Sequence, residues 1–492
     1  MSNAVVIAST LLVPLIGTVG IATFHQRPNL REAVTLGAAV ILFLLVLSLY
    51  PEVAAGGRPG VVLFTVLPGL DLALSVEPLG MLFGLVASFL WIVTSVYSIG
   101  YMRGNNESHQ TRFYICFAIA LASTMGVAFA DNMFTMFIFY EVLTLSTYPL
   151  VTHSGTDEAR RAGRVYLGIL LGTSICLQLF AVIWTWSLTG TLDFTDGGIL
   201  KGAASPALTG VLFAMYVFGI GKAALMPFHR WLPAAMVAPT PVSALLHAVA
   251  VVKAGVFAIL KVSVYVFGID YLREIGAGTW LVYVAGATVI IASLVALSKD
   301  NLKARLAYST VSQLSYVIIA AAVLAPLSVM GAAIHIAAHA FGKITLFFAA
   351  GSIYTAAHKT EVSQLNGIGR RMPWTMAAFA IGSLSMVGLP PTAGFVSKWY
   401  ILLGALETEQ LVVVGIIFVS TLLNAAYFFP IVYVAFFRPA PEESGNEAHG
   451  SDGEAPLLVV AALVVTALGT VALFLLPDLS ISLARQLSEV GP

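Results

Sequence analysis

The clearest pattern along the chain is a succession of apolar runs separated by short polar loops. A hydrocarbon core of ~30 Å is crossed by about 20 apolar residues in a helix. The pattern therefore predicts an all-α polytopic membrane protein with about 14 transmembrane helices. The expected spans are residues 4–24, 31–50, 79–101, 113–130, 132–152, 164–188, 208–228, 240–268, 278–298, 306–325, 327–355, 373–404, 409–437 and 455–477.

Two segments near the start of the chain need separate treatment. The first apolar run lacks a basic n-region and a small-residue cleavage site, so it is expected to be a retained span. Between the second and third spans, residues 61–74 carry two short apolar runs on either side of Pro68 and Gly69. This arrangement predicts a short β-hairpin packed at the surface.

The composition agrees with a chain that lies in lipid. The 492 residues are 59% hydrophobic and 10% charged, whereas soluble domains have about 25% charged residues. Basic and acidic side chains number 24 each, so the formal net charge is zero. No basic field therefore suggests a nucleic-acid partner.

Basic residues are distributed unevenly between alternate loops. If the N-terminus faces outside, the inner loops hold fifteen and the outer loops four, which follows the positive-inside rule. Both termini are then extracytoplasmic, and the expected location is a cell membrane, the inner membrane of a bacterium. The inner set is Arg27, Arg31, Arg103, Arg112, Arg160, Arg161, Arg164, Arg230, Lys299, Lys303, Arg305, Lys359, Arg370, Arg371 and Arg438, and the outer set is Arg58, Lys201, Arg273 and Arg485.

The remaining basic residues are lysines inside predicted spans, namely Lys222, Lys253, Lys261, Lys343 and Lys398. A charged side chain at mid-membrane costs about 2.5–3.5 kcal/mol, so each must face polar groups, a partner or water. Lys261 lies toward the outer end of its span and is expected to snorkel to the interface. The deeper lysines are candidates for proton transfer, because burial favours the neutral form of a lysine.

Glu141 is the only acidic residue deep in a predicted span. A carboxylate opposite a buried lysine stabilises both charged forms, and separating the two lets the lysine release its proton. We therefore expect Glu141 to belong to a switchable acid–base pair. A passive structural salt bridge is the alternative.

Three titratable groups recur every four residues at His335, His339 and Lys343. This spacing places them on one face of a helix, displaced by about 40° and ~6 Å from one to the next. Two histidines at this spacing could also bind zinc, but neither the glutamate of a zincin nor a cysteine accompanies them. A proton relay along the stripe is the preferred interpretation, because imidazole can pass a proton between its ring nitrogens.

Two spans that carry lysines also contain helix breakers, within residues 219–227 and 388–394. Broken helices at membrane depth line cavities, and a pair in corresponding halves indicates an internal repeat. Their separation predicts two inverted five-helix repeats over 113–268 and 278–437, each with one broken helix. Around the repeats we expect helices 1–3 in 1–112, an inner loop at 438–456, and the last helix with an outer C-terminus in 455–492.

Taken together, these motifs closely resemble the antiporter-like membrane subunits shared by Mrp-type cation/proton antiporters, respiratory complex I and membrane-bound hydrogenases. The resemblance covers nearly the whole chain. Its motifs are, in chain order, Tyr140-Glu141, Lys222 with Pro227, His229, Trp231 and Pro233, then Pro239, Pro241 and Ser243 before His247 and Lys253, then His335, His339 and Lys343, and finally Gly388, Pro390, Pro391, Gly394 and Lys398.

The resemblance implies roles for these residues. Glu141 and Lys222 would form the modulating ion pair, and Lys398 would be the terminal proton site of the second half-channel. A lysine at this last position resembles D-type Mrp subunits and L- and N-type complex I subunits, and the chain ends soon after its last span, unlike L-type and A-type subunits. The D-type Mrp subunit is therefore the expected match. The central axis would comprise Lys253, His335, His339 and Lys343.

The expected function is proton translocation within a multisubunit Na+/H+ antiporter, so the chain is taken to be part of a transporter and not an enzyme. Its expected partners are other membrane subunits and the lipid bilayer, without a nucleic acid or a soluble small-molecule substrate. No Walker loop, dinucleotide fingerprint or cysteine cluster is present, so no cofactor is expected. The transported ion is H+, and few buried carboxylates are available for Na+, whose path is expected largely in another subunit.

Three alternatives stay open at this point. The chain could be a proton-pumping subunit of complex I or of a hydrogenase. It could be a structural scaffold whose buried charges only orient helices, or a secondary transporter that works alone. Loss of assembly without loss of turnover would favour the scaffold, and ion exchange by the purified chain would favour the solitary transporter.

Overall fold

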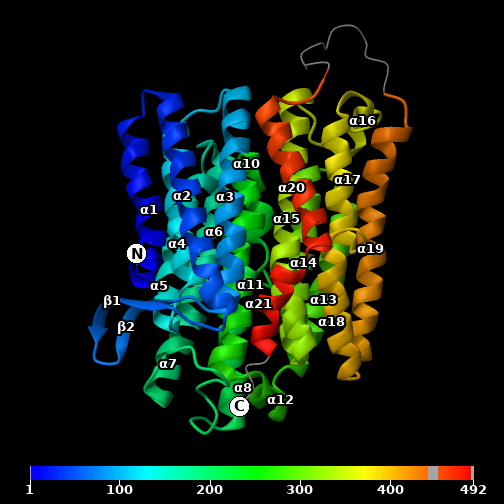
Figure 1. Cartoon of the computed structure of the whole chain (residues 1–492). Helices are drawn as coiled ribbons and strands as arrows, with labels where there is room; N and C mark the ends of the chain where they lie inside the picture. The colour runs from blue at the N-terminus through cyan, green and yellow to red at the C-terminus, as the bar shows by residue number, and fades with distance from the viewer. Residues whose placement is uncertain (1, 441–452, 489–492) are drawn as a thin grey trace.

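The computed structural model of the chain describes residues 2–440 and 453–488, and it omits the side chains of residues 246, 247 and 488. The side chain of His247 and most of the predicted inner loop at 438–456 therefore lie outside the described residues. The described chain is a bundle of long helices that run side by side (Figure 1).

Eleven helices are long and apolar enough to cross a membrane, counted over the described residues. Because these segments are apolar over at least 18 residues, their backbone groups are best satisfied within a helix. They are α1 (Asn3–Thr23), α2 (Pro28–Ala54), α3 (Pro78–Gly104), α4 (Gln110–Ala128), α5 (Met133–Val151), α6 with α7 (Asp157–Thr189), α13 (Thr279–Ser298), α14 (Leu302–Val323), α15 (Pro326–Ala357), α19 (Leu411–Phe437) and α20 (Leu457–Leu475).

Over the same described residues three further spans are interrupted, which brings the number of spans to the predicted fourteen. One is α8 (Pro206–Gly219) with a 3-10 turn at Gly221–Ala223, and another is α17 (Pro373–Val387) with α18 (Ala393–Glu407). The third consists of α10 (Thr240–Ala244), a π-helical segment at Leu245–Val249, α11 (Val251–Val262) and a second π-helical segment at Ser263–Phe267. The first two breaks confirm the predicted broken helices, whereas the π-helical segments were not predicted.

The remaining elements are short. Helices α9 (Trp231–Ala234), α12 (Ile269–Glu274), α16 (Ile368–Arg371) and α21 (Asp478–Ser488) lie between or after the spans, and 3-10 turns occupy Ala235–Val237 and Val362–Gln364. Another π-helical segment, Ser174–Leu179, joins α6 (Asp157–Thr173) to α7 (Phe180–Thr189).

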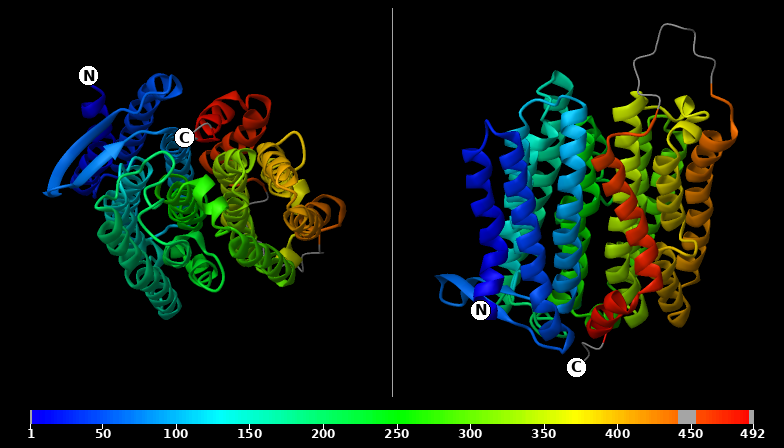
Figure 2. Two further views of the ribbon diagram at one scale, coloured as in Figure 1. Left: turned by 90° about the horizontal axis from the view of Figure 1, so that it is seen from below. Right: turned by 45° about the horizontal axis from the view of Figure 1, so that its top comes forward.

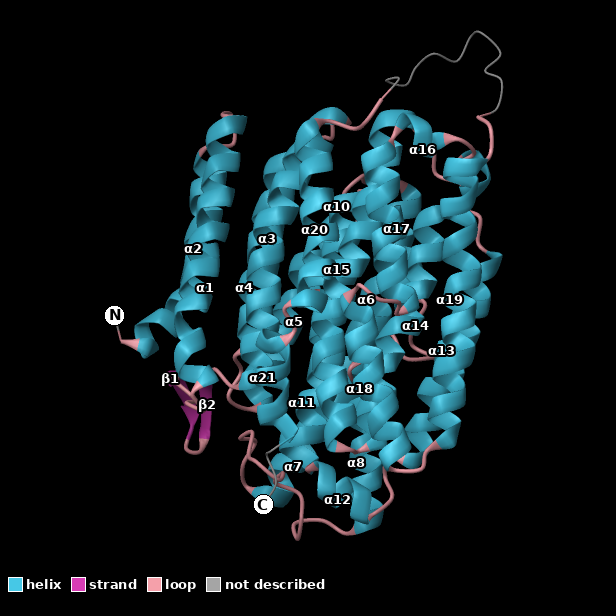
Figure 3. Ribbon diagram, turned by 45° about the vertical axis from the view of Figure 1, so that its right-hand side comes forward, coloured by secondary structure: helices cyan, strands magenta, loops and turns pink. Residues whose placement is uncertain are grey.

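The hairpin expected near residues 61–74 is confirmed. Strands β1 (Gly60–Leu67) and β2 (Leu70–Ser75) pair antiparallel and form the two-stranded sheet seen at one edge of the bundle (Figure 3). Gly69 has a φ of +82°, a value that glycine adopts without a steric penalty, so the turn falls at the predicted place. Ala73 and Leu74 of β2 are buried, whereas most of β1 is exposed.

The two ends of the bundle differ in their charge. We call the end that holds α16 and the loops with Arg27, Arg103 and Arg160 the basic end, and the opposite end, with β1, β2 and α12, the hairpin end (Figure 1). Helix α4 runs from the basic end to the hairpin end, and α13 runs the opposite way. The two five-helix units that begin with α4 and α13 therefore have inverted orientations, and each has its broken helix in the fourth place.

Burial separates a polar centre from an apolar exterior. The most apolar windows of α14 and α15 are 94% and 100% buried, whereas those of α1, α2, α19 and α20 are 33–39% buried and expose apolar side chains. Seen along the bundle, the two halves of the chain form neighbouring groups of helices (Figure 2). The long helix α15 packs against α14, α17, α18, α20 and α3, so its side chains are enclosed by both protein halves.

Candidate functional site

Lys222 lies in the 3-10 turn that ends the first half of a broken span. Helix α8 stops at Gly219, and Ala224 takes a left-handed conformation with a φ of 54°. Gly221 is required for close packing, because a Cβ there would lie 2.2 Å from the Thr173 hydroxyl oxygen. The indole of Trp231 donates to the Gly221 carbonyl at 3.0 Å, so the turn that presents Lys222 is fixed on both sides.

The Lys222 ammonium is completely buried and is held by α5. It donates to the Tyr140 carbonyl at 2.7 Å and to the Thr144 hydroxyl at 2.6 Å, and it lies 3.1 Å from the centroid of the Tyr140 ring. The Tyr140 hydroxyl also accepts a hydrogen bond from the Lys222 amide at 3.1 Å. These neutral oxygens and the aromatic ring stabilise a cation without neutralising it.

Glu141 follows Tyr140 on α5 but does not form an ion pair with Lys222 in this structure. Among the described residues, neither carboxylate oxygen of Glu141 has a hydrogen-bond partner, although both are buried. A buried carboxylate without a partner carries a desolvation cost that a nearby cation or water would reduce. The modulating pair therefore stays a prediction, and the structure shows the two groups on adjacent sites and unpaired.

Lys253 and His339 meet in the centre of the molecule. Lys253 Nζ of α11 and His339 Nδ1 of α15 are 2.6 Å apart, and both side chains are buried. Helix α11 also touches the Lys222 turn, because a Cβ on Gly255 would lie 2.4 Å from the Lys222 carbonyl carbon. The first-half lysine and the central pair therefore belong to elements in direct contact.

His335 extends this pair toward the second broken helix. Its ring centroid is 6.0 Å from that of His339, one turn along α15, and 5.7 Å from that of Tyr316 on α14. His335 Nδ1 lies 2.8 Å from the Ser397 hydroxyl of α18. The two histidines thus connect Lys253 of α11 to Ser397 of α18. The group that faces His339 Nδ1 is the Lys253 ammonium, which is not a metal ligand.

Lys398 is held by the backbone that the second break releases. Helix α17 ends at Val387 and is followed by Gly388, whose φ of 89° is left-handed. Lys398 donates to the carbonyls of Met386 at 2.8 Å and Val387 at 3.0 Å. A Cβ on Gly388 would lie 2.7 Å from the Lys398 Cδ, so glycine is needed there for space as well. The ammonium lies 4.6 Å from the centroid of the Tyr316 ring.

Lys343 projects from α15 toward α14 and α19. It donates to the Ser309 hydroxyl at 2.9 Å and to the Leu306 carbonyl at 3.4 Å, and its ammonium lies 5.6 Å from the Phe428 ring centroid. The Tyr427 hydroxyl donates to the same Ser309 oxygen at 3.1 Å. The polar stripe on α15 therefore reaches α11, α18 and the α14–α19 side.

Lys261 corrects the sequence-based interpretation. It does not snorkel, because its side chain has 0% relative exposure and lies 3.1 Å from Oε1 of Glu77, whose side chain is 7% exposed. Glu77 immediately precedes α3 and is distant in the sequence, so no local spacing could indicate the pair. The buried Glu77 carboxylate gives the Lys261 ammonium a partner of opposite charge, so the side chain does not have to extend to the membrane surface.

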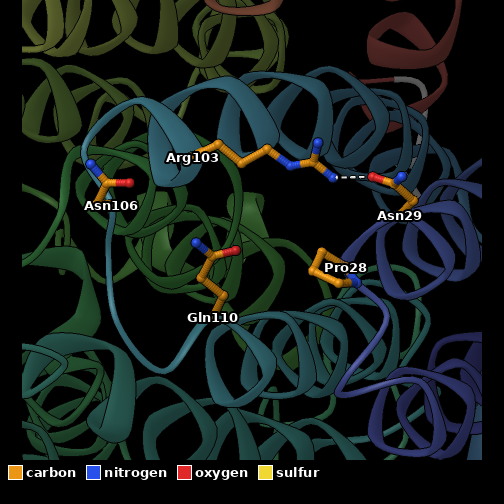
Figure 4. Close-up of a pocket in the computed structure, with 5 residues that line it drawn as sticks. All are labelled: Pro28, Asn29, Arg103, Asn106 and Gln110. Atoms are coloured by element: carbon orange, nitrogen blue, oxygen red, sulfur yellow. Dashed lines mark hydrogen bonds between the residues drawn. The ribbon is translucent and has the colours of Figure 1, made fainter.

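Two cavities open at the basic end, and neither contains the predicted lysines of the relay. One of about 380 Å³ lies at the ends of α2 and α3, where Arg103 donates to Asn29 at 2.6 Å beside Pro28 and Gln110 (Figure 4). The other, of about 270 Å³, lies between the two halves and includes Glu107 and Lys303. Burial raises the pKa of Glu107 and the nearby Lys303 opposes that rise.

Sequence comparison identifies the family. The family described as NADH:quinone oxidoreductase/Mrp antiporter, TM, matches residues 130–424. The chain belongs to the NADH:quinone oxidoreductase/Mrp antiporter family. It is a multi-pass membrane protein of that family and an antiporter-like transporter subunit.

Individual members of the NADH:quinone oxidoreductase/Mrp antiporter family differ in how much of their length the chain matches. NADH-quinone oxidoreductase subunit N of Desulforudis audaxviator is 33% identical over 434 residues, 84% of either chain. Hydrogenase-4 component B of Escherichia coli is 33% identical over 67% of this chain but 50% of its own length. A chain in the Mrp complex structure from a Dietzia species has the same fold, with a TM-score of 0.86, 22% identity and coverage of 99% and 97%.

Proposed function

We propose that this chain is the proton-translocating subunit of a multisubunit Na+/H+ antiporter of the Mrp type, corresponding to the D-type subunit. The observation that carries the proposal is the chain of titratable groups through the bundle centre, from Lys253 through His339 and His335 toward Lys398. The likeness to a chain of an Mrp complex supports it, as does a lysine at position 398. Other membrane subunits are the partners that this function requires.

Proton transfer would start at Lys222. When the ammonium leaves Tyr140 and Thr144, it loses two hydrogen bonds, and its proton passes to Lys253 on the neighbouring helix α11. Glu141 sets how readily this happens, because an approaching carboxylate stabilises the charged lysine and a receding one favours release. Glu141, unpaired in this structure, is positioned next to the residues that hold Lys222.

The histidines would carry the proton across the centre. Lys253 gives its proton to Nδ1 of His339, the other ring nitrogen releases one toward His335, and Ser397 orients the His335 ring for transfer onward to Lys398. The first of these steps is direct, since Lys253 Nζ and His339 Nδ1 are 2.6 Å apart. The step between the histidines needs a small rotation or one intervening water, since the two ring centroids are 6.0 Å apart. The basic end would face the cytoplasm by the positive-inside rule.

The test is sodium-dependent proton flux in membrane vesicles that lack endogenous antiporters, with the complete operon-encoded complex. We expect Lys222→Ala to lower the flux at least about tenfold, because the relay loses a proton-binding group. A tenfold loss corresponds to an increase of ~1.4 kcal/mol in the activation free energy of transport. Lys201→Ala is the control, since Lys201 is 64% exposed at the hairpin end. Assembly of both variants is followed by purification of the complex.

A second candidate function is proton pumping within a redox-driven complex. It is favoured by the match to subunit N of an NADH-quinone oxidoreductase, which covers 84% of either chain. Near-normal flux in an assembled Lys222→Ala complex would refute both functions as relays through Lys222. Absence of sodium-dependent flux from the unmodified complex would favour the redox-driven function instead.

A further inference from the structure

The relay described above does not use the buried lysine–carboxylate pair of Glu77 and Lys261 at the hairpin end. Lys261 Nζ lies 3.1 Å from Glu77 Oε1 and donates to the Ala130 carbonyl at 2.8 Å. The ammonium also lies 4.6 Å from the Phe194 ring centroid and 5.4 Å from that of Phe257. These contacts enclose the pair between α3, α11 and the segment that joins α4 to α5.

Glu77 is the fixed member of the pair. Its carboxylate accepts hydrogen bonds from the amides of Leu79 at 2.6 Å and Gly80 at 2.9 Å, which makes it the N-cap of α3. The N-terminus of a helix favours a negative charge there. Apart from Glu77, the described residues hold the Lys261 ammonium through one backbone group, the Ala130 carbonyl, whereas Glu77 is held by two amides, so Lys261 is the member of the pair that moves more easily.

A polar connection leads from the pair to water at the hairpin end. The Tyr265 hydroxyl donates to Glu77 Oε2 at 3.4 Å, and the Arg58 guanidinium lies 5.7 Å from the Tyr265 ring centroid. Arg58 in turn forms an ion pair with Asp196 at 2.9 Å, with side-chain exposures of 35% and 49%. Polar groups thus extend stepwise from full burial to half exposure.

Other charged groups lie around the pair. Asp131 lies in the turn between α4 and α5. Burial raises the pKa of its carboxyl, and the positive charge of Lys261 opposes this rise. Asp71 of β2 and Asp193 raise the pKa of Asp131 further. The surroundings of Lys261 are therefore rich in carboxylates, which stabilise a positive charge at this place.

Helix α11 joins the pair to the centre of the molecule. It carries Lys253 near its start and Lys261 near its end. Eight residues correspond to a rise of about 12 Å along a helix. The span between them is apolar, with Phe257 against the Lys261 ammonium, so the connection requires water to enter or Lys261 to move.

We propose that Glu77 and Lys261 form a proton-exchange port at the hairpin end, through which the central relay communicates with water on that side. This inference rests on the proposed function. In the outward step an N–H bond of the Lys261 ammonium breaks and the proton moves to Glu77 Oε1, which leaves both groups neutral. Glu77 then passes that proton to water beside Tyr265, and a proton from the Lys253 side restores the ammonium.

An ion pair that only ties α3 to α11 is the competing explanation, and Lys261→Arg separates the two. Arginine keeps the positive charge and can pair with Glu77, but it does not release its proton in a protein. A structural tie survives this change, whereas a port does not. Lys201→Arg is the matched control, because Lys201 pairs with Glu274 at 3.2 Å on the exposed surface of the same end.

The measurement is sodium-dependent proton flux of the complete complex in vesicles, with assembly checked by purification. We expect Lys261→Arg to lower the flux at least about tenfold in an assembled complex, and Lys201→Arg to leave it unchanged. Flux within twofold of the unmodified complex would overturn the port. If Lys261→Arg prevents assembly, Tyr265→Phe decides instead, because it removes only the hydroxyl that contacts Glu77. A flux lowered several-fold then supports the port and an unchanged flux overturns it.

The Lys222→Ala complex, measured in parallel, keeps the two proposals distinguishable. If Lys222→Ala retains its flux, the proposed function fails whatever the Lys261 variant does. If Lys222→Ala loses its flux and Lys261→Arg retains it, the relay stands and only the port falls.

Discussion

The two broken helices present their lysines in contrasting surroundings. In the first half, Lys222 sits in the break itself and is held by a helix from another span, through Tyr140 and Thr144. In the second half, Lys398 lies on the helix after the break and is held by two carbonyls that the break releases. Among the described residues no acidic side chain pairs with Lys398, whereas Glu141 is adjacent to the residues that bind Lys222.

From this difference we infer that the two halves have different roles in proton transfer. A lysine held by a neighbouring helix and flanked by a carboxylate can be switched when that helix or carboxylate moves. A lysine held by its own span's carbonyls keeps the same partners, so its proton occupancy depends on what arrives from His335. The first half would then control the relay and the second half would complete it.

The largest effect is expected from removing the second lysine. Lys398→Met deletes the last titratable group of the relay and removes the side-chain donor of the Val387 carbonyl, whereas the Met386 carbonyl keeps the Gln313 amide at 3.3 Å. We expect sodium-dependent flux to fall at least about tenfold, at a cost in stability of about 1–3 kcal/mol for the Val387 carbonyl that loses its donor. Flux and thermal unfolding of the purified complex are compared with those of Lys201→Met.

Normal flux in an assembled Lys398→Met complex would contradict the inference that Lys398 completes the relay in the second half. The relay would then end at His335 or continue elsewhere. The next group to examine would be Lys343, which is bound by Ser309 and reaches the α14–α19 side of the molecule.

A smaller effect is expected from the acidic residue that distinguishes the first half. Glu141→Gln keeps the size of the side chain and leaves the contacts of Lys222 with Tyr140 and Thr144 intact. We expect a loss of roughly three- to tenfold in flux, corresponding to about 0.7–1.4 kcal/mol, because only the control of Lys222 is removed. The assay is the same vesicle flux, with assembly as the control.

If Glu141→Gln abolishes flux as completely as Lys222→Ala, Glu141 carries the proton itself. Control and conduction would then not be divided between the halves as inferred. A Glu141→Gln complex indistinguishable from the unmodified one would instead identify Glu141 as a passive buried group.

Much of the architecture could be predicted from the sequence because membrane spans are encoded locally. A run of about 20 apolar residues requires a helix in lipid. Gly388 and the prolines after it prevent helix continuation, so this break is visible without any partner. The hairpin around Gly69 was predictable for the same reason, since its turn needs a residue tolerant of positive φ.

The contacts of the site could not be predicted in the same way, because they join distant segments. Lys261 was expected to snorkel, but its partner Glu77 lies before α3, and only the fold brings the two together. The apolar sequence around Lys253 likewise contains no signal for the flanking π-helical segments. The sequence did not indicate that Thr144 and Ser397 contact Lys222 and His335, because serines and threonines in a helix commonly bond to the backbone of that helix.

The smallest effect concerns the hydroxyl that holds Lys222 from the neighbouring helix. Thr144→Val keeps the shape of the side chain but removes the acceptor that lies 2.6 Å from the ammonium, whereas Thr144→Ser keeps it. One hydrogen bond contributes about 0.5–1.5 kcal/mol, so we expect the valine variant to change flux by roughly two- to tenfold and the serine variant to stay near normal. Within the described part of the chain, Lys398 donates to backbone carbonyls and to no side-chain acceptor, so this sensitivity should be confined to the first half. Equal flux in the valine and serine variants would mean that the Tyr140 carbonyl and ring suffice to hold Lys222, and the contrast between a switchable and a fixed lysine would then rest on Glu141 alone.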